Sequence, residues 1–290
     1  MGSIANVLDG LGDLAGATDM QQQSLQAFRK AGDRRGELST LANLGNVLVE
    51  RGELQSAKQN YQQALKLAEE TGYKRGLGYI LPGLATVLRD QDKLPEARTT
   101  LEQANSVHKE LKDEINTARN QILLADIALE QGQVAEAQTL IGGVKDVFAK
   151  EKMSDASSAS EALLARAWLA QGKIREAQVS AGRALDFSKE ATDRTVSFDA
   201  SFAVASVNAA SGRTTEALRA METVRTEASR LGYAGYGFEA RLRLGEIELR
   251  SGKANAARAR LEQLSKDAET KDFLLVARKA KAALGRGIGQ

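Results

Sequence analysis

The chain has 290 residues, a formal net charge of +2 and no cysteine, so it can form neither disulfides nor thiolate metal sites. The 40 Lys and Arg residues are balanced by 38 Asp and Glu, which gives no general attraction to nucleic acid or to an anionic membrane; we expect neither as a partner. The composition is 42% hydrophobic but only 4% aromatic, with 2 prolines, which is typical of a helical protein and unlike an average enzyme domain.

No apolar run is long enough to cross a membrane, and the opening MGSIANVLDG lacks the charged and apolar regions of a secretory signal. Together with the absence of cysteine, this predicts a cytoplasmic location. The letters MGS resemble a cloning remnant, so we expect the chain to be a piece of a longer protein.

Residues repeat along the whole chain with a period of 40. Glycine occupies positions 12, 52, 132, 172, 212 and 252, with Asp92 as the exception. Five residues later stands an unbroken alanine column: Ala17, Ala57, Ala97, Ala137, Ala177, Ala217 and Ala257. A fixed period of this size predicts a solenoid of stacked units and excludes a single-core domain.

Each unit reads as two helices separated by the glycine, which ends the first helix in a left-handed conformation. The alanine column, and a second small column that includes Gly45 and Ala85, allow helices to approach closely. The predicted units are 1–35, 36–75, 76–115, 116–155, 156–195, 196–235 and 236–275, with a capping helix at 272–285 and a disordered tail at 286–290.

The residues Leu44-Gly45, Leu48, Gly52, Ala57, Tyr61 and Ala64 resemble the tetratricopeptide (TPR) pattern. This resemblance covers nearly the whole chain and implies an all-α fold, a right-handed α-solenoid of about seven helix-turn-helix units. The 40-residue unit departs from the common 34 residues and resembles kinesin light chain repeats and the C-terminal arrays of bacterial signalling proteins, where a Ser/Thr kinase or a winged-helix domain precedes the array.

The first unit begins in the middle of a helix. We therefore expect an exposed apolar edge there, which favours excision from a longer array or self-association through this edge.

Solenoids bind ligands on their concave face, and the resemblance implies that the first helix of each unit lines it. One polar residue per unit follows the second small column, and the alternatives for this row are a ligand-facing groove or plain solvation. The row consists of Asn6, Asn46, Thr86, Asp126, Arg166, Ser206 and Glu246. By resemblance, Asn6 and Asn46 would bond the backbone of an extended peptide.

Further groove candidates lie one turn away from the row. They are Tyr79, Arg89, Asp90, Arg119, Glu130, Asp199, Phe202, Glu239 and Arg250. Their mixed charges indicate no single charge class of ligand.

Pro82 lies inside a predicted helix, where it would act as a hinge or be tolerated as a local distortion; we favour the second. His108 falls in a packing column and is interpreted as a core residue. The aromatic stretch GYAGYGF at 232–238 is interpreted as packing between units. We expect the carboxylates to lie on exposed faces, and no catalytic motif occurs, so the sequence predicts no enzyme, cofactor or metal.

The sequence thus favours a module that binds a protein or peptide segment in its groove, as a scaffold or regulatory arm of a larger bacterial signalling protein. The alternative is a sensor of a small ligand or autoinducer peptide that changes the shape of the superhelix on binding.

Overall fold

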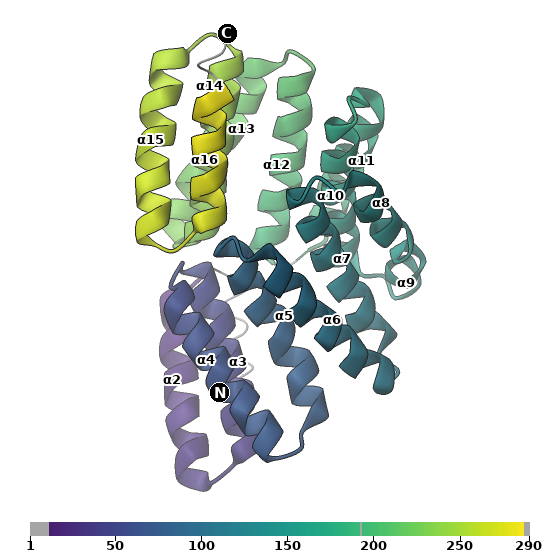
Figure 1. Cartoon of the computed structure of the whole chain (residues 1–290), viewed down its shortest axis with the longest axis vertical. Coiled ribbons are helices and arrows are strands. Elements are labelled where there is room, and N and C mark those ends of the chain that lie inside the picture. Colours follow the sequence, from purple (N-terminus) through teal and green to yellow (C-terminus); the bar gives the residue numbers. More distant parts are fainter. Residues whose placement is uncertain (1–11, 192, 287–290) are drawn as a thin grey trace.

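The computed structural model describes residues 12–191 and 193–286, and this part of the chain contains helices and turns only. The expected all-α solenoid is confirmed (Figure 1). The helices are α2 Leu14–Ala31, α3 Arg34–Glu50, α4 Leu54–Glu70, α5 Lys74–Asp90, α6 Leu94–Glu110, α7 Glu114–Glu130, α8 Val134–Gly142, α9 Lys145–Lys150, α10 Ser154–Ala170, α11 Ile174–Ser188, α12 Arg194–Ala210, α13 Thr214–Leu231, α14 Ala234–Arg250, α15 Ala254–Thr270 and α16 Leu274–Arg286. None of these helices is long and apolar enough to cross a membrane.

Helices begin every 20 residues, apart from the additional start at Lys145, because the linking turns share one geometry. A residue with positive φ precedes most of the helices, and glycine supplies it at positions such as Gly52 (φ 74°) and Gly172 (φ 72°). Where the sequence lacks glycine, Asp92, Lys112, Lys152 and Asp272 adopt the same conformation. The turn geometry therefore persists even where the residue that favours it is missing.

The second helix of the fourth unit is interrupted between α8 and α9, a feature that the period did not predict. Helix α8 ends at Gly142, and Gly143 and Val144 form the break. Two adjacent glycines weaken a helix because their backbone loses the most entropy on folding.

The alanine and glycine residues of the two small-residue columns lie where neighbouring helices pack against one another. Ala57, Ala137 and Ala177 are completely buried. At Gly45, an added Cβ would lie 2.6 Å from the ring of Tyr61, so only glycine admits this ring. Close approach of neighbouring helices is thus built into each unit.

The two ends of the array meet, so that the superhelix closes on itself (Figure 1). Leu41 and Leu44 of α3 share one apolar cluster with Phe273 and Val276 at α16. An added Cβ on Gly52 would lie 2.5 Å from the Cβ of Ala234 and 3.2 Å from the ring of Phe273, so the turn before α4 touches the last two units.

Polar contacts accompany this apolar seam. Gln55 Nε2 donates to Asp272 Oδ2 at 2.7 Å. Arg278 Nε and Nη2 donate to the two carboxylate oxygens of Asp92 at 2.6 and 2.9 Å. A bidentate Arg–carboxylate pair fixes relative orientation, so these contacts set the register between the two ends.

The apolar edge that we expected on the first unit is covered where it is described. Leu14 is 3% exposed and packs with Phe198, Phe202 and Tyr233 of the sixth and seventh units. Residues 1–11 lie outside the described residues, as do residues 287–290 of the expected tail at 286–290, while Arg286 is the last residue of α16.

Pro82 is accommodated within a continuous helix, α5. Proline has no N–H, so the carbonyl of Gly78 loses its helical donor. His108 Nε2 lies 3.0 Å from that oxygen and must carry the proton, because a carbonyl only accepts. An added Cβ on Gly78 would lie 2.7 Å from the His108 ring, so glycine permits this approach. His108 is 4% exposed and replaces the missing backbone donor.

We expect His108→Phe to lower the free energy of unfolding by about 1–3 kcal/mol, because it keeps the ring volume but leaves a buried carbonyl unsatisfied. In a Pro82→Ala background the penalty should shrink, because an alanine at this position would restore the N–H donor to the carbonyl of Gly78. Urea denaturation of the four proteins measures this coupling. An equal penalty in both backgrounds would contradict the assigned role of His108.

Candidate binding cavity

The closed superhelix surrounds a cavity of about 610 Å³. It is lined by the first helix of each described unit, α3, α5, α7, α10, α12 and α14, and by α16. This volume lies within the range of ligand pockets, about 300–1,000 Å³. The concave face therefore forms a deep, partly open cavity.

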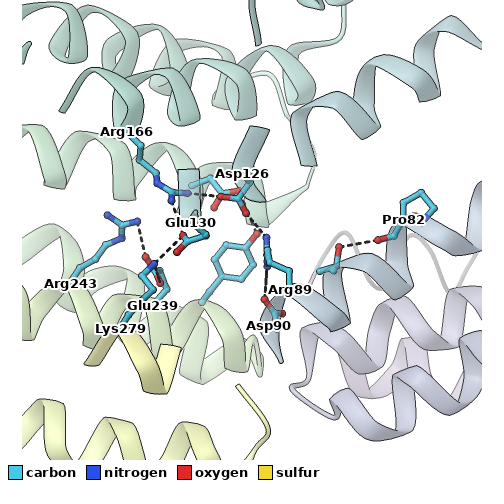
Figure 2. A network of polar contacts seen from close by, with 12 residues as sticks. Pro82, Arg89, Asp90, Asp126, Glu130, Arg166, Glu239, Arg243 and Lys279 are labelled. Carbon is cyan, nitrogen blue, oxygen red and sulfur yellow. Dashed lines mark hydrogen bonds and ion pairs between the residues drawn. The ribbon is translucent and has the colours of Figure 1, made fainter. Parts of the chain in front are cut away.

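Charged side chains cross the cavity wall as a connected network, shown in Figure 2. Asp126 accepts hydrogen bonds from Arg89 Nη1 at 2.8 Å and from Arg166 Nη1 at 2.6 Å. Arg166 Nη2 donates to Glu130 Oε1 at 2.7 Å, and Lys279 of α16 donates to the same oxygen at 3.2 Å. The network thus joins α5, α7 and α10 to the last helix, across the seam.

The network continues on α14. Glu239 pairs with Arg243 at 2.7 Å and lies 3.8 Å from Lys279. Arg243 Nη1 also donates to the hydroxyl of Ser206 at 2.6 Å. Each of these charges has an opposite charge beside it, as buried ions require.

The electrostatics favour the ionised state of two acids of the network, Asp126 and Glu239. Burial raises the pKa of Asp126, but Arg166 and Arg89 outweigh this effect and hold the pKa well below its ordinary value. For Glu239, Lys279 and Arg243 likewise outweigh burial and lower the pKa. Our expectation that the carboxylates lie on exposed faces is wrong here, because arginines on neighbouring helices compensate them inside the wall.

An aromatic side of the cavity lies on α12 and α14. The rings of Phe202 and Tyr236 stack, with centroids 6.1 Å apart and an interplanar angle of 15°. The guanidinium of Arg243 lies 4.9 Å from the centre of the Phe202 ring. Tyr233 is buried against Phe198, so the 232–238 stretch does pack between units, but its Tyr236 also lines the cavity.

Asp199 differs from the other acids of the wall. No cation of the described chain lies within ion-pair distance of it, and its hydrogen bond is with the Tyr236 hydroxyl at 3.5 Å. Burial and the nearby Asp126 raise the pKa of Asp199 to about 7, against the opposing effect of Arg89 and Arg243.

We expect Asp199→Asn to stabilise the protein more at pH 8 than at pH 5. An unfolded aspartate has a pKa of about 3.9, so between about pH 4 and pH 7 the folded state holds a proton that the unfolded state lacks. The contribution of Asp199 to stability therefore falls as pH rises through this window, by about 1–2 kcal/mol after allowance for solvent screening. Urea denaturation at the two pH values measures it, with Asp186→Asn on an exposed face as the control. A pH-independent difference would contradict the raised pKa.

Several of the residues proposed for the groove from the sequence line this cavity. They are Asn46, Thr86, Arg89, Asp126, Arg166 and Phe202, with Asp90, Glu130, Asp199 and Glu239 among the further candidates. Asn46 Oδ1 accepts a hydrogen bond from the Tyr61 hydroxyl at 2.6 Å, so Nδ2 is the end of this amide that can serve a ligand.

The remaining candidates are placed elsewhere. Tyr79 is 50% exposed and its hydroxyl donates to Asn43, while Arg119 forms a surface pair with Asp155. Ser206 lies behind Arg243. Glu246 and Arg250 are not among the lining residues, and Asn6 lies outside the described residues.

Sequence reasoning missed Lys279, Arg243 and Tyr236. Lys279 follows Asp199 and Glu239 in one 40-residue column, so extending that column into the capping helix would have found it. No such signal exists for Arg243, whose column holds Ala203, Leu163 and other unrelated residues.

The chain is built from paired helices in 40-residue units, and the first helix of each pair lines the cavity. This arrangement defines the class of protein as a tetratricopeptide-repeat superhelix. The sequence matches the family described as MalT-like TPR region over residues 3–263, and the chain belongs to this family. Comparison of the sequence with curated proteins gave no significant match.

Solved structures with the same fold include a Rap protein, NprR and BtubC. A Rap protein complexed with competence and sporulation factor has a TM-score of 0.64 at 13% identity, covering 95% of this chain and 80% of that one. NprR in complex with its cognate peptide NprX has a TM-score of 0.69 at 16% identity, with coverages of 90% and 75%. BtubC from P. vanneervenii has a TM-score of 0.55 at 18% identity, with coverages of 77% and 92%. At these identities the likeness shows the fold.

Proposed function

We propose that this chain is a peptide-binding module that holds a short peptide segment inside its central cavity. The observation that carries the proposal is the central cavity of about 610 Å³, in which polar, aromatic and aliphatic side chains converge from eight helices. A cavity of this size suits a few residues of a peptide and not a long segment. The likeness in fold to a Rap protein complexed with competence and sporulation factor, and to NprR in complex with its cognate peptide NprX, supports this choice.

We further propose that the module is the regulatory arm of a larger bacterial signalling protein. We propose binding and not catalysis as its role, because Asp126, Glu130 and Glu239 of the wall are engaged in ion pairs with arginine and lysine side chains of the protein itself.

A second candidate function is that of a sensor whose shape responds to the ligand. The observation that favours it is that the cavity wall includes α3 and α5 from one end and α14 and α16 from the other, so a ligand inside would contact both sides of the seam. Such a ligand would stabilise the closed state by its differential affinity for it. Small-angle X-ray scattering with and without bound peptide tests this: a smaller radius of gyration on binding supports a sensor, and an unchanged one supports a static module.

The binding site itself is tested by affinity selection from a randomised library of capped heptapeptides, with retained peptides identified by mass spectrometry. Ala159 lines the cavity, so Ala159→Trp should fill it and abolish retention. Ala256→Trp, on the exposed face of α15, adds the same side chain elsewhere and should retain the same peptides as wild type. Equal retention by both variants, each with the helical circular dichroism of wild type, would place binding outside the cavity.

A further inference from the structure

The cavity wall contains more acids than bases. Its lining includes seven carboxylates and four cations. The four cations are Arg89, Arg166, Arg243 and Lys279, and each is already paired with one or two of the acids Asp90, Asp126, Glu130 and Glu239. Each cation is therefore already charge-compensated within the protein, and an anionic ligand would have to compete with an existing ion pair, which is costly.

The three remaining acids are Glu50, Asp193 and Asp199, and Asp193 has a structural role. Asp193 caps α12, accepting hydrogen bonds from the backbone N–H of Thr195 at 2.8 Å and from its hydroxyl at 2.7 Å. Capping orients this carboxylate toward the helix end.

Asp199 has no such role. It is on the wall of the cavity, its hydrogen bond to Tyr236 is long at 3.5 Å, and no ion pair with a described cation compensates its charge. A carboxylate in this setting gains most from a cation supplied by a ligand.

Aromatic rings lie beside Asp199. Tyr236 hydrogen-bonds to it and stacks on Phe202, and Arg243 already lies over the Phe202 ring. A carboxylate next to an aromatic ring suits an alkylammonium or guanidinium group, because the ion pair and the cation–π attraction act on the same charge.

We infer that the cavity binds a ligand with a cationic group, and that Asp199 and Tyr236 are its specificity-determining contacts. The inference rests on the proposed function in taking the cavity as the ligand site. The cation can belong to a Lys or Arg side chain of a peptide or to a free diamine or polyamine, and the two sources share this chemistry.

The raised pKa of Asp199, about 7, adds a second observable. A cation bound beside this carboxylate would lower its pKa, so binding near pH 7 should release a proton. Several charged and titratable groups face Asp199 from the neighbouring helices and set this value. They are Asp126, Arg89, Arg243, Asp193 and Tyr236.

The test repeats the heptapeptide selection with wild type, Asp199→Asn and the control Asp186→Asn, which removes the same charge from an exposed position. Wild type and the control should enrich Lys or Arg at one peptide position at least tenfold, and Asp199→Asn should lose this enrichment. For an enriched peptide, isothermal titration calorimetry in buffers of different ionisation enthalpy should show proton release with wild type and none with Asp199→Asn.

The outcomes separate this inference from the proposed function. Retained peptides without a basic preference would overturn the inference and leave peptide binding standing. If wild type retains no peptide, the proposed function fails, and titration with 1,5-diaminopentane and spermidine decides the inference. Binding that Asp199→Asn abolishes would uphold it for a free amine; no binding would overturn it.

Discussion

Replacing Asp126 with alanine is expected to lower the free energy of unfolding by about 3–5 kcal/mol. Asp126 lies between the guanidinium groups of Arg89 and Arg166, at 2.8 and 2.6 Å. Without the carboxylate, two arginines in the cavity wall lose their shared counter-charge and repel one another. Arg89 keeps Asp90 and Arg166 keeps Glu130 as a partner, but breaking two partly buried ion pairs at once costs far more than breaking a surface ion pair.

The matched control is Asp155→Ala, which removes a carboxylate paired with Arg119 at 3.1 Å, where both side chains are about half exposed. Its cost should be at most about 1 kcal/mol. The difference in the free energy of unfolding between wild type and Asp126→Ala should shrink below about pH 4. A group whose pKa is lowered in the folded state stabilises that state only while the group is ionised. Equal costs for the two variants in urea denaturation would show that the network is solvated.

We expect Gly52→Ala to lower the free energy of unfolding by about 2–5 kcal/mol. The backbone part is about 1–2 kcal/mol, because Gly52 has a φ of 74° and alanine is strained in the left-handed region. The rest, about 1–3 kcal/mol, is overpacking, because the new methyl group would lie 2.5 Å from Ala234 across the seam.

Gly172→Ala is the control for the backbone part. Gly172 has nearly the same φ of 72°, and nothing lies within 4 Å of an added Cβ. It should therefore cost only about 1–2 kcal/mol. Equal losses for Gly52→Ala and Gly172→Ala would mean that the two ends of the array are not in contact.

These predictions separate what the sequence could foresee from what it could not. The helices, turns and small-residue columns were predictable, because the contacts that fix them lie within a unit or between neighbours and repeat every 40 residues. The positive φ at Gly52 and Gly172 belongs to this local pattern, and so does the polar row that includes Asp126 and Arg166 in the cavity wall.

Closure of the ring could not be predicted from the repeats in the sequence. It depends on the rotation between units accumulated over the whole array, which no single repeat encodes. The seam joins Gln55 to Asp272 and Asp92 to Arg278, residues of different units with no shared column. The acid excess of the cavity was missed for the same reason, because the sequence did not reveal which charges pair with one another.

The closed ring is the central claim, and cross-linking tests it most directly. The chain has no cysteine, so cysteines introduced at Gln55 and Asp272, which are hydrogen-bonded across the seam, would be the only reactive thiols. A short bismaleimide added to dilute protein should join them within one molecule, as identified by mass spectrometry of the linked peptides, while a control pair at Gln55 and Arg175, on the distant α11 (Figure 1), should stay unlinked. Full labelling of both 55 and 272 without an intramolecular link would mean that the superhelix is open and that its two ends do not meet.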